Sequence, residues 1–141
     1  MSSTFIAFDF GMTKMGVAIG QNITNTASPL DHMVMRNGSP DWDLVERLIK
    51  EYRPITIILG KPKVIDESSE ALMKKIKAFK RSLERDFSQN VEWTPEHLTS
   101  KDAKEKLKVR RQEGILSRKI MKGQVNRMAA TIFLQDWMDQ R

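Results

Sequence analysis

The first twenty residues alternate apolar segments with a short polar turn. Residues 4–8 are β-branched or aromatic with few polar interruptions, a pattern typical of a buried strand. A second apolar segment, 15–20, follows after a turn bracketed by Gly11 and Gly16. Glycine supplies the backbone conformations that tight turns need. The pattern therefore predicts a β-hairpin at the start of the chain.

Residues 26–35 hold several apolar and β-compatible side chains and predict a third strand, which the Asn-Gly-Ser-Pro segment at 37–40 ends. We expect a helix over 41–53, with Ser39 as its N-cap and Pro40 at its first position. Pro54 should stop it. The apolar residues that follow helical spacing in this segment are Trp42, Val45, Leu48, Ile49 and Tyr52.

The middle of the chain alternates strands and helices. Residues 55–59 are apolar and predict a buried strand, 67–87 an amphipathic helix, and 91–94 a further short strand. A strand, a helix and a strand in succession imply a crossover with parallel pairing. The apolar stripe of the second helix is Leu72, Ile76, Phe79, Leu83 and Phe87.

The segment 101–122 contains nine Lys or Arg residues against three acidic residues and few apolar ones. Such a helix buries little, so it is either a solvated arm or one that faces phosphates. Gly114 and Gly123 predict breaks. A last helix over 124–138 has its packing face at Val125, Met128, Ala129, Ile132 and Phe133.

Size and composition narrow the class of protein. The 141 residues suit a single domain, 1–141, with its own core, and we see no repeat or linker. There is no cysteine, which excludes disulfides and thiolate metal sites and suits a reducing cytoplasm. No stretch has the length of a membrane span or the layout of a secretory signal. The net charge of +6 favours a polyanionic partner, although solubilising surface charge explains it equally well.

Two acidic residues stand directly after predicted strands. Asp9 follows the first strand, where a carboxylate is costly to bury unless a cation meets it. Hard divalent cations prefer such oxygen ligands. The alternative is an Asp that caps its own turn. Glu96 follows the last strand, and Asn126 lies in the first turn of the final helix. This order of strands, helices and polar residues is similar to the ribonuclease H-like fold, in which carboxylates hold Mg²⁺ or Mn²⁺ for phosphodiester hydrolysis.

Four segments also resemble one known family. They are Ala7-Phe8-Asp9-Phe10-Gly11 with Gly16-Val17-Ala18, the Gly60-x-Pro62 loop, Glu96-x-Leu98-Thr99-Ser100-x-x-Ala103, and Lys122-Gly123-x-Val125-x-x-x-Ala129-Ala130. Together they resemble the bacterial YqgF (RuvX) family, described as Holliday-junction resolvases and as pre-16S rRNA nucleases. The resemblance runs from about residue 3 to 138 and implies an α/β fold, a mixed five-stranded sheet flanked by helices.

The resemblance assigns catalytic and metal-binding roles residue by residue. Asp9 matches the first metal-binding Asp of the family and Glu96 its second acid, whereas Asn126 stands where the family has a third acid. The neighbours of Glu96 also differ, being Pro95 and His97. Two carboxylates hold Mg²⁺ less tightly than three. We therefore expect one weakly bound Mg²⁺ or Mn²⁺ on Asp9 and Glu96, with Asn126 as a neutral ligand.

The basic residues suggest where nucleic acid binds. Lys61 and Lys63 lie at the carboxyl end of a strand, where open α/β sheets bind ligands. They are candidate phosphate contacts, or simply surface lysines of a polar loop. The full set of candidate nucleic-acid contacts is Lys14, Lys61, His97, Arg110, Arg111 and Lys122.

These observations predict a cytoplasmic, metal-dependent nuclease that trims the 5′ end of pre-16S rRNA, as a monomer or weak homodimer without membrane attachment. The alternatives are a nucleic-acid-binding protein with weakened catalysis and a resolvase of branched DNA. The hairpin is also similar to the phosphate loop of actin-like ATPases, but those need two lobes and several hundred residues. The Asp-Phe-Gly of protein kinases is excluded, because no Gly-rich loop or His-Arg-Asp segment accompanies it.

Overall fold

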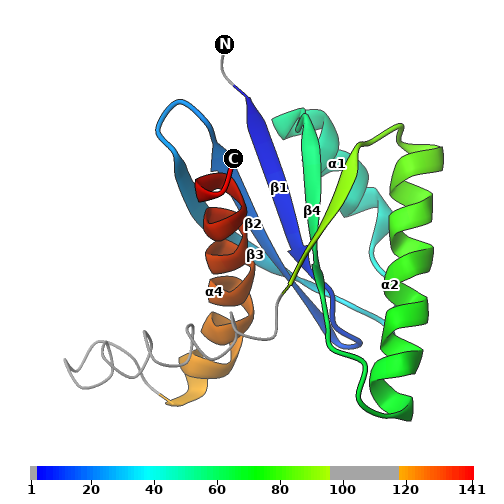
Figure 1. The fold of residues 1–141 in the computed structure, drawn as a ribbon. Coiled ribbons are helices and arrows are strands. Elements are labelled where there is room, and N and C mark those ends of the chain that lie inside the picture. The colour runs from blue at the N-terminus through cyan, green and yellow to red at the C-terminus, as the bar shows by residue number, and fades with distance from the viewer. Residues whose placement is uncertain (1–2, 96–117) are drawn as a thin grey trace.

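The computed structural model describes residues 3–95 and 118–141, with side chains from residue 128 onward in the last helix. Five strands form one mixed sheet in the order β3-β2-β1-β4-β5 (Figure 1). β1 pairs antiparallel with β2 and parallel with β4, and β4 pairs parallel with β5. The strand bounds are β1 Thr4–Asp9, β2 Lys14–Gln21, β3 Thr26–Val34, β4 Thr56–Lys61 and β5 Val91–Pro95.

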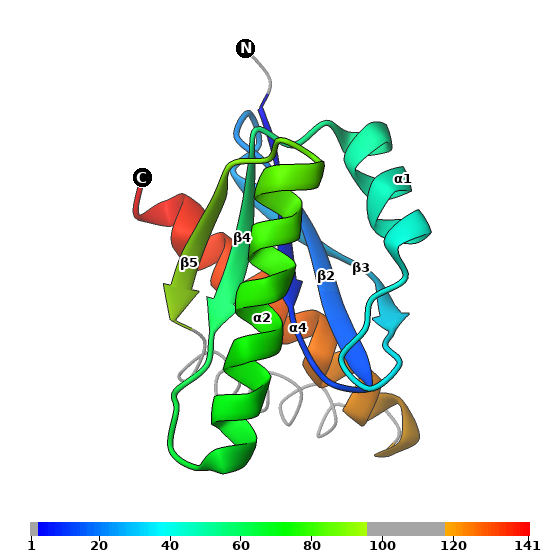
Figure 2. The same ribbon diagram turned by 90° about the vertical axis from the view of Figure 1, so that its right-hand side faces the viewer.

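Within the described residues, three helices cover the two faces of the sheet. α1 (Trp42–Tyr52) and α2 (Glu67–Asp86) lie on one face, and α4 (Arg118–Asp139) lies on the other (Figures 1 and 2). The strand–helix–strand order β1-β2-β3-α1-β4-α2-β5 therefore produces the parallel half of the sheet by crossovers, as the sequence predicted.

The pleat of each strand divides the core in two. Ile6 and Phe8 of β1 pack in a cluster with Phe79 and Leu83 of α2. Phe5 and Ala7, which alternate with them, pack instead against α4. To this second cluster α4 contributes Ala130, Phe133, Leu134 and Met138.

Most predicted elements are confirmed within one or two residues, but two helix boundaries were wrong. The N-cap of α1 is Asp41 rather than Ser39: its side chain accepts a hydrogen bond from the Leu44 backbone N–H at 3.2 Å. α4 begins at Arg118 and runs through Gly123, where a break was predicted. A single glycine costs a helix only about 1 kcal/mol, so flanking helical residues outweigh it. The predicted break at Gly114 lies outside the described residues.

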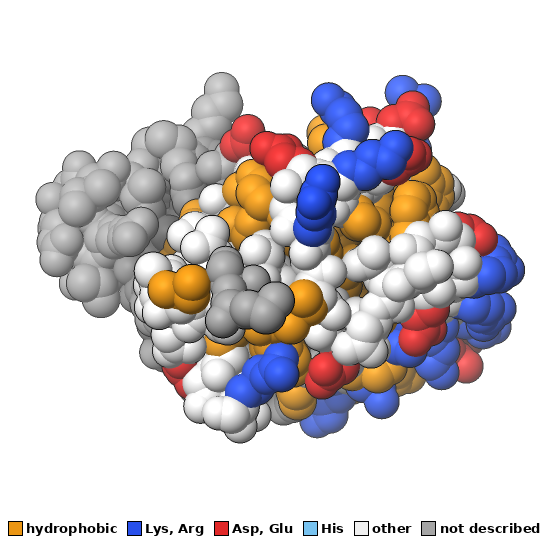
Figure 3. Space-filling model, turned by 90° about the horizontal axis from the view of Figure 1, so that it is seen from above, with side chains coloured by type: hydrophobic (Ala, Val, Ile, Leu, Met, Phe, Trp, Pro, Cys, Tyr) orange, Lys and Arg blue, Asp and Glu red, His pale blue; other side chains and the backbone are white. Residues whose placement is uncertain are grey.

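The described surface mixes charges of both signs. Seen from above, at the edge where β1 begins, Lys and Arg side chains are interspersed with Asp and Glu around the rim (Figure 3). Local ion pairs such as Lys50–Glu46 on α1 and Lys80–Glu84 on α2 belong to this surface. None of the described helices is long and apolar enough to cross a membrane.

Candidate active site

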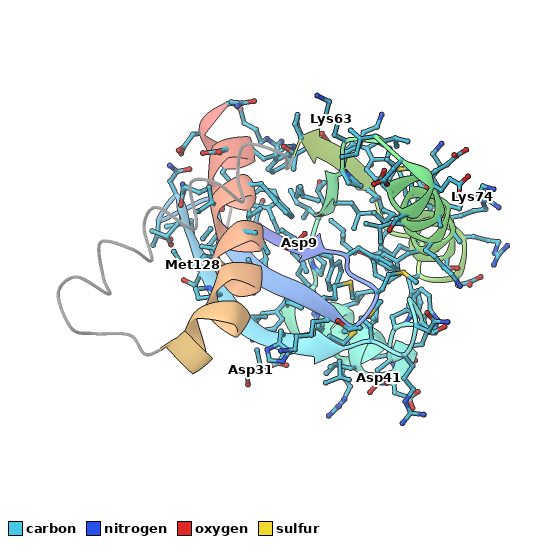
Figure 4. The ribbon with its side chains drawn as sticks, turned by 90° about the horizontal axis from the view of Figure 1, so that it is seen from below. Asp9, Asp31, Asp41, Lys63, Lys74 and Met128 are labelled. Carbon is cyan, nitrogen blue, oxygen red and sulfur yellow. The ribbon has the colours of Figure 1, made fainter. Side chains whose placement is uncertain are left out.

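One edge of the sheet gathers the described residues that the sequence singled out. Because β1, β4 and β5 are parallel, their carboxyl ends share this edge, and antiparallel β2 begins there. Asp9 ends β1, Lys14 begins β2 and Lys61 ends β4. Figure 4 views the molecule from this side, with Asp9 at the tip of β1. The edge is the place where a doubly covered sheet leaves room for a ligand.

The carboxylate of Asp9 belongs to the face that α4 covers. Its neighbours Phe8 and Phe10 both pack in the cluster on the α1–α2 face, so the residue between them lies on the opposite side. Asp9 is half-buried and pairs with Gly16 across the hairpin. It is therefore a carboxylate at the rim of the core, on the side from which α4 approaches.

The turn after Asp9 is fixed by backbone contacts. A Cβ at Gly11 would collide with the backbone carbonyl oxygen of Lys14, so no larger residue fits this turn as it is built. The segment after β3 also bonds to this turn: the Gly38 N–H donates to the carbonyl oxygen of Met12 at 2.8 Å, and the Met35 N–H donates to the carbonyl oxygen of Thr13 at 2.9 Å. These bonds hold the turn that follows Asp9 in one conformation.

α4 runs along the sheet toward the Asp9 edge. Its C-terminal end lies at the far edge, where a Cβ on Gly20 would meet Met138 and Leu134. Its middle lies on small side chains, with Ala130 packed in the cluster that includes Ala7 and Ala18. Small residues let a helix approach a sheet closely. The alanines in the family-like segments thus explain how α4 docks over the face that holds Asp9.

The other predicted site residues are placed only in part. The backbone of Asn126 and of Lys122 lies in α4, with Asn126 one helical turn before Ala130. The side chains of both residues lie outside the described part. Glu96 directly follows Pro95, the last residue of β5. Glu96, His97, Arg110 and Arg111 lie outside the described residues. Among the side chains that are described, no three His, Asp or Glu gather in a metal-binding group.

Lys61 lies on the opposite face of the sheet from Asp9. Its register partner is Pro95 of β5, and its Nζ lies 5.8 Å from the ring centroid of Trp93. Trp93 packs against the α1–α2 core, so both side chains are on that face. Trp93 was not among the predicted site residues; its place near the end of the last predicted strand, close to Glu96, was the available signal.

The sequence of this chain is similar to those of known proteins. A family model described as "RuvX: Holliday junction resolvase" matches residues 3–140. The chain belongs to the RuvX family. It is 38% identical over 140 residues to a protein of Escherichia coli O139:H28 (strain E24377A / ETEC) named "Putative pre-16S rRNA nuclease", covering 99% of each chain. A Shigella flexneri serotype 5b (strain 8401) protein of the same name matches equally.

Solved structures similar to this RuvX-family chain show its fold. The Holliday junction resolvase of fowlpox virus superposes with a TM-score of 0.55 at 17% identity, covering 98% of this chain and 99% of that one. Thermus thermophilus RuvC, in complex with a Holliday junction substrate, superposes with a TM-score of 0.51 at 13% identity, covering 96% and 97%. The predicted ribonuclease H-like fold with its mixed five-stranded sheet is confirmed.

Proposed function

We propose that this chain is a metal-dependent nuclease that acts on structured nucleic acid, with the 5′ end of pre-16S rRNA as its substrate. The observation that carries the proposal is the half-buried carboxylate of Asp9 at the carboxyl end of β1, in a chain that belongs to the RuvX family. The names of relatives 38% identical over almost the whole chain support the substrate.

The oxygen chemistry of the predicted site suits Mg²⁺ or Mn²⁺. Asp9 and Glu96 supply carboxylates, and Asn126 supplies a neutral amide oxygen; hard divalent ions accept all three. When bound, such an ion supplies charge to activate the water and to stabilise the leaving oxygen of a phosphodiester. Asn126 brings no charge, so its role is to orient and complete the oxygen set. The α4 backbone supports this role, because Asn126 precedes Ala130 by one turn in the direction of the Asp9 edge.

The cationic charge needed to hold a polyanion is concentrated in one stretch of the sequence. Residues 96–127 contain ten Lys and Arg against four acidic residues, which accounts for the entire net charge of +6. The rest of the chain has fourteen of each sign. We propose that Arg110, Arg111 and Lys122 in this stretch provide the main phosphate contacts, assisted by His97 and by Lys14 and Lys61 at the sheet edge.

A second candidate function rests on Asn126. Replacing the third acid of the family removes one negative charge from the metal site, and weaker metal binding would leave a protein that binds nucleic acid but cuts it slowly. A third, resolution of branched DNA, is favoured by the family description. Symmetric cutting of a junction requires a two-fold dimer, whereas rRNA trimming suits a monomer or weak homodimer.

One experiment separates these functions. The protein is incubated with a pre-16S rRNA 5′ fragment and with a four-way DNA junction, in Mg²⁺, in Mn²⁺ and in EDTA. The proposal predicts metal-dependent cutting of the RNA, loss of cutting in Asp9→Asn with binding retained, and no change in Asp43→Asn, which removes an exposed carboxylate of α1. Binding of both substrates without cutting in any metal supports the second function and contradicts the first. Cutting of the junction alone supports the third.

A further inference from the structure

A cleft of about 460 Å³ opens at the same sheet edge as Asp9 but on the opposite face. One wall is the loop after β4 and the other is the end of β5; its lining residues are Lys61, Pro62, Lys63, Trp93, Thr94 and Pro95. Its volume is in the range that holds small organic ligands. Figure 4 shows Lys63 beside the tip of β5, separated from Asp9 by the ends of the strands.

The cleft combines an aromatic wall with two cations. Trp93 packs against the α1–α2 core and remains half-buried, so its indole is held in place while part of it faces the cleft. The Lys61 ammonium lies 5.8 Å from the centre of that ring, within cation–π range. Among residues 3–95 and 118–141, the acidic residues of the ion pairs lie on α1 and α2, and Lys61 and Lys63 take part in none of these pairs. Their charge is therefore available at the mouth of the cleft.

We infer that this cleft binds one unpaired nucleotide of the RNA strand, an inference that rests on the proposed nuclease function. The base stacks on Trp93, and Lys61 and Lys63 contact the adjoining phosphates. Every base has a π-face, so aromatic stacking with nearby cations is the usual means of holding a single strand without reading its sequence. An apolar peptide would fit the aromatic wall but would leave the two lysines without a complementary charge.

The position of the cleft specifies the form of the substrate. Asp9 faces α4 and Trp93 faces α2, so a strand that occupies both places must bend around the ends of β4 and β5. A duplex is too stiff to follow so short a path, because double-stranded DNA already has a persistence length of about 150 base pairs. The substrate is therefore single-stranded beside the bond that is cut. In this arrangement Trp93 stacks on the base, and the Lys and Arg residues of 96–127 bind the phosphates.

The test measures binding in EDTA, which separates it from cleavage. Dissociation constants are determined by fluorescence anisotropy for a labelled single-stranded RNA of about ten nucleotides, its duplex and the DNA strand of the same sequence. Trp93→Ala should weaken binding of the single-stranded RNA by about tenfold or more, with little effect on the duplex. Lys61→Gln should weaken it severalfold, whereas Lys74→Gln, which removes an exposed lysine of α2, should not.

A second measurement stands if Trp93→Ala fails to fold. In the unaltered protein, the indole N–H signal that disappears in Trp93→Phe identifies Trp93 in an NMR spectrum. That signal should shift when the single-stranded RNA is added and stay in place when the duplex is added. No shift, or equal affinities in a folded Trp93→Ala protein, would overturn the inference, and tighter binding of the DNA strand would overturn the assignment to RNA. If the strand binds as expected and nothing is cut in Mg²⁺ or Mn²⁺, the nuclease proposal fails, whereas the inference that the cleft binds a nucleotide is supported.

Discussion

Two glycine-to-alanine substitutions in the first hairpin should differ strongly in their effect on stability. A Cβ at Gly11 meets the backbone carbonyl oxygen of Lys14, which cannot move without breaking the turn after Asp9. A Cβ at Gly20 meets the Sδ of Met138 at 2.6 Å and Cδ2 of Leu134 at 3.1 Å, both at the ends of flexible side chains. Neither glycine has a positive φ, so the comparison isolates the collision from backbone strain.

The size of each effect follows from what must move. Forcing an extra carbon into a packed site costs about 1–3 kcal/mol. Because the neighbour of Gly11 is a backbone carbonyl that cannot move aside, we expect Gly11→Ala to cost about 3 kcal/mol. Met138 and Leu134 can change rotamer, so Gly20→Ala should cost about 1 kcal/mol or less. For a domain of this size each kcal/mol lowers the melting temperature by about 4 °C. We therefore expect a fall of about 12 °C for Gly11→Ala and of about 4 °C or less for Gly20→Ala.

Thermal and urea unfolding followed by circular dichroism measure both changes. Gly11→Ala should also reduce cleavage of the pre-16S rRNA fragment well below its melting temperature, because the distorted turn directly follows Asp9. Gly20→Ala should leave cleavage close to normal at the same temperature. Equal melting temperatures for the two variants, or a Gly11→Ala protein as stable as the parent, would refute the account of a turn fixed by backbone contact.

Four further outcomes are expected. Asn126→Asp should bind Mg²⁺ severalfold more tightly in isothermal titration calorimetry, because a third carboxylate joins the site; unchanged affinity would remove Asn126 from the metal site. Phe133→Ala empties a fully buried position between α4 and the sheet and should lower the free energy of unfolding in urea by about 3–5 kcal/mol. Hydrogen bonds from the Ser69 backbone N–H and hydroxyl lower the pKa of Asp66, the N-cap of α2, so its contribution to stability is complete above the unfolded-state pKa near 3.8 and is lost as the pH falls through the folded-state pKa. The stability difference between the parent and Asp66→Ala in urea should accordingly be constant near neutral pH and shrink in acid. Replacing both Arg110 and Arg111 with Gln should reduce the slope of log Kd against log salt for single-stranded RNA by about 0.7 per arginine, whereas an unchanged slope would place both side chains away from phosphate.

Local pattern was enough to predict most of the fold. Apolar runs separated by turn residues identified all five strands, and helical spacing identified α1 and α2 nearly to the residue. The errors fell where two local signals competed. Ser39 and Asp41 are both good caps, and only the bond from Leu44 to Asp41 decides between them. Gly123 is a weak breaker, and the helix around it continues.

The candidate site was predictable in its chemistry and less so in its geometry. The position of Asp9 at a strand end is legible in the sequence, and the structure confirms that it ends β1. The pairing of Glu96 and Asn126 with it stays a prediction. The contact between Trp93 and Lys61 was not predicted, because a tryptophan in a strand is usually core, and only the register Leu59↔Trp93 and Lys61↔Pro95 brings the two side chains together.

The sequence alone determined the apolar runs and stripes from which the core is built, where the net charge of +6 lies along the chain, and that an amide stands in place of a third carboxylate. These are properties of residue type and spacing, which are complete before the chain folds. Only the tertiary structure decided that Asp9 and Lys61 take opposite faces of one sheet edge. The side of a strand on which a residue lies depends on the pleat and on registers between strands far apart in the chain, and a shift of one residue would exchange the two faces.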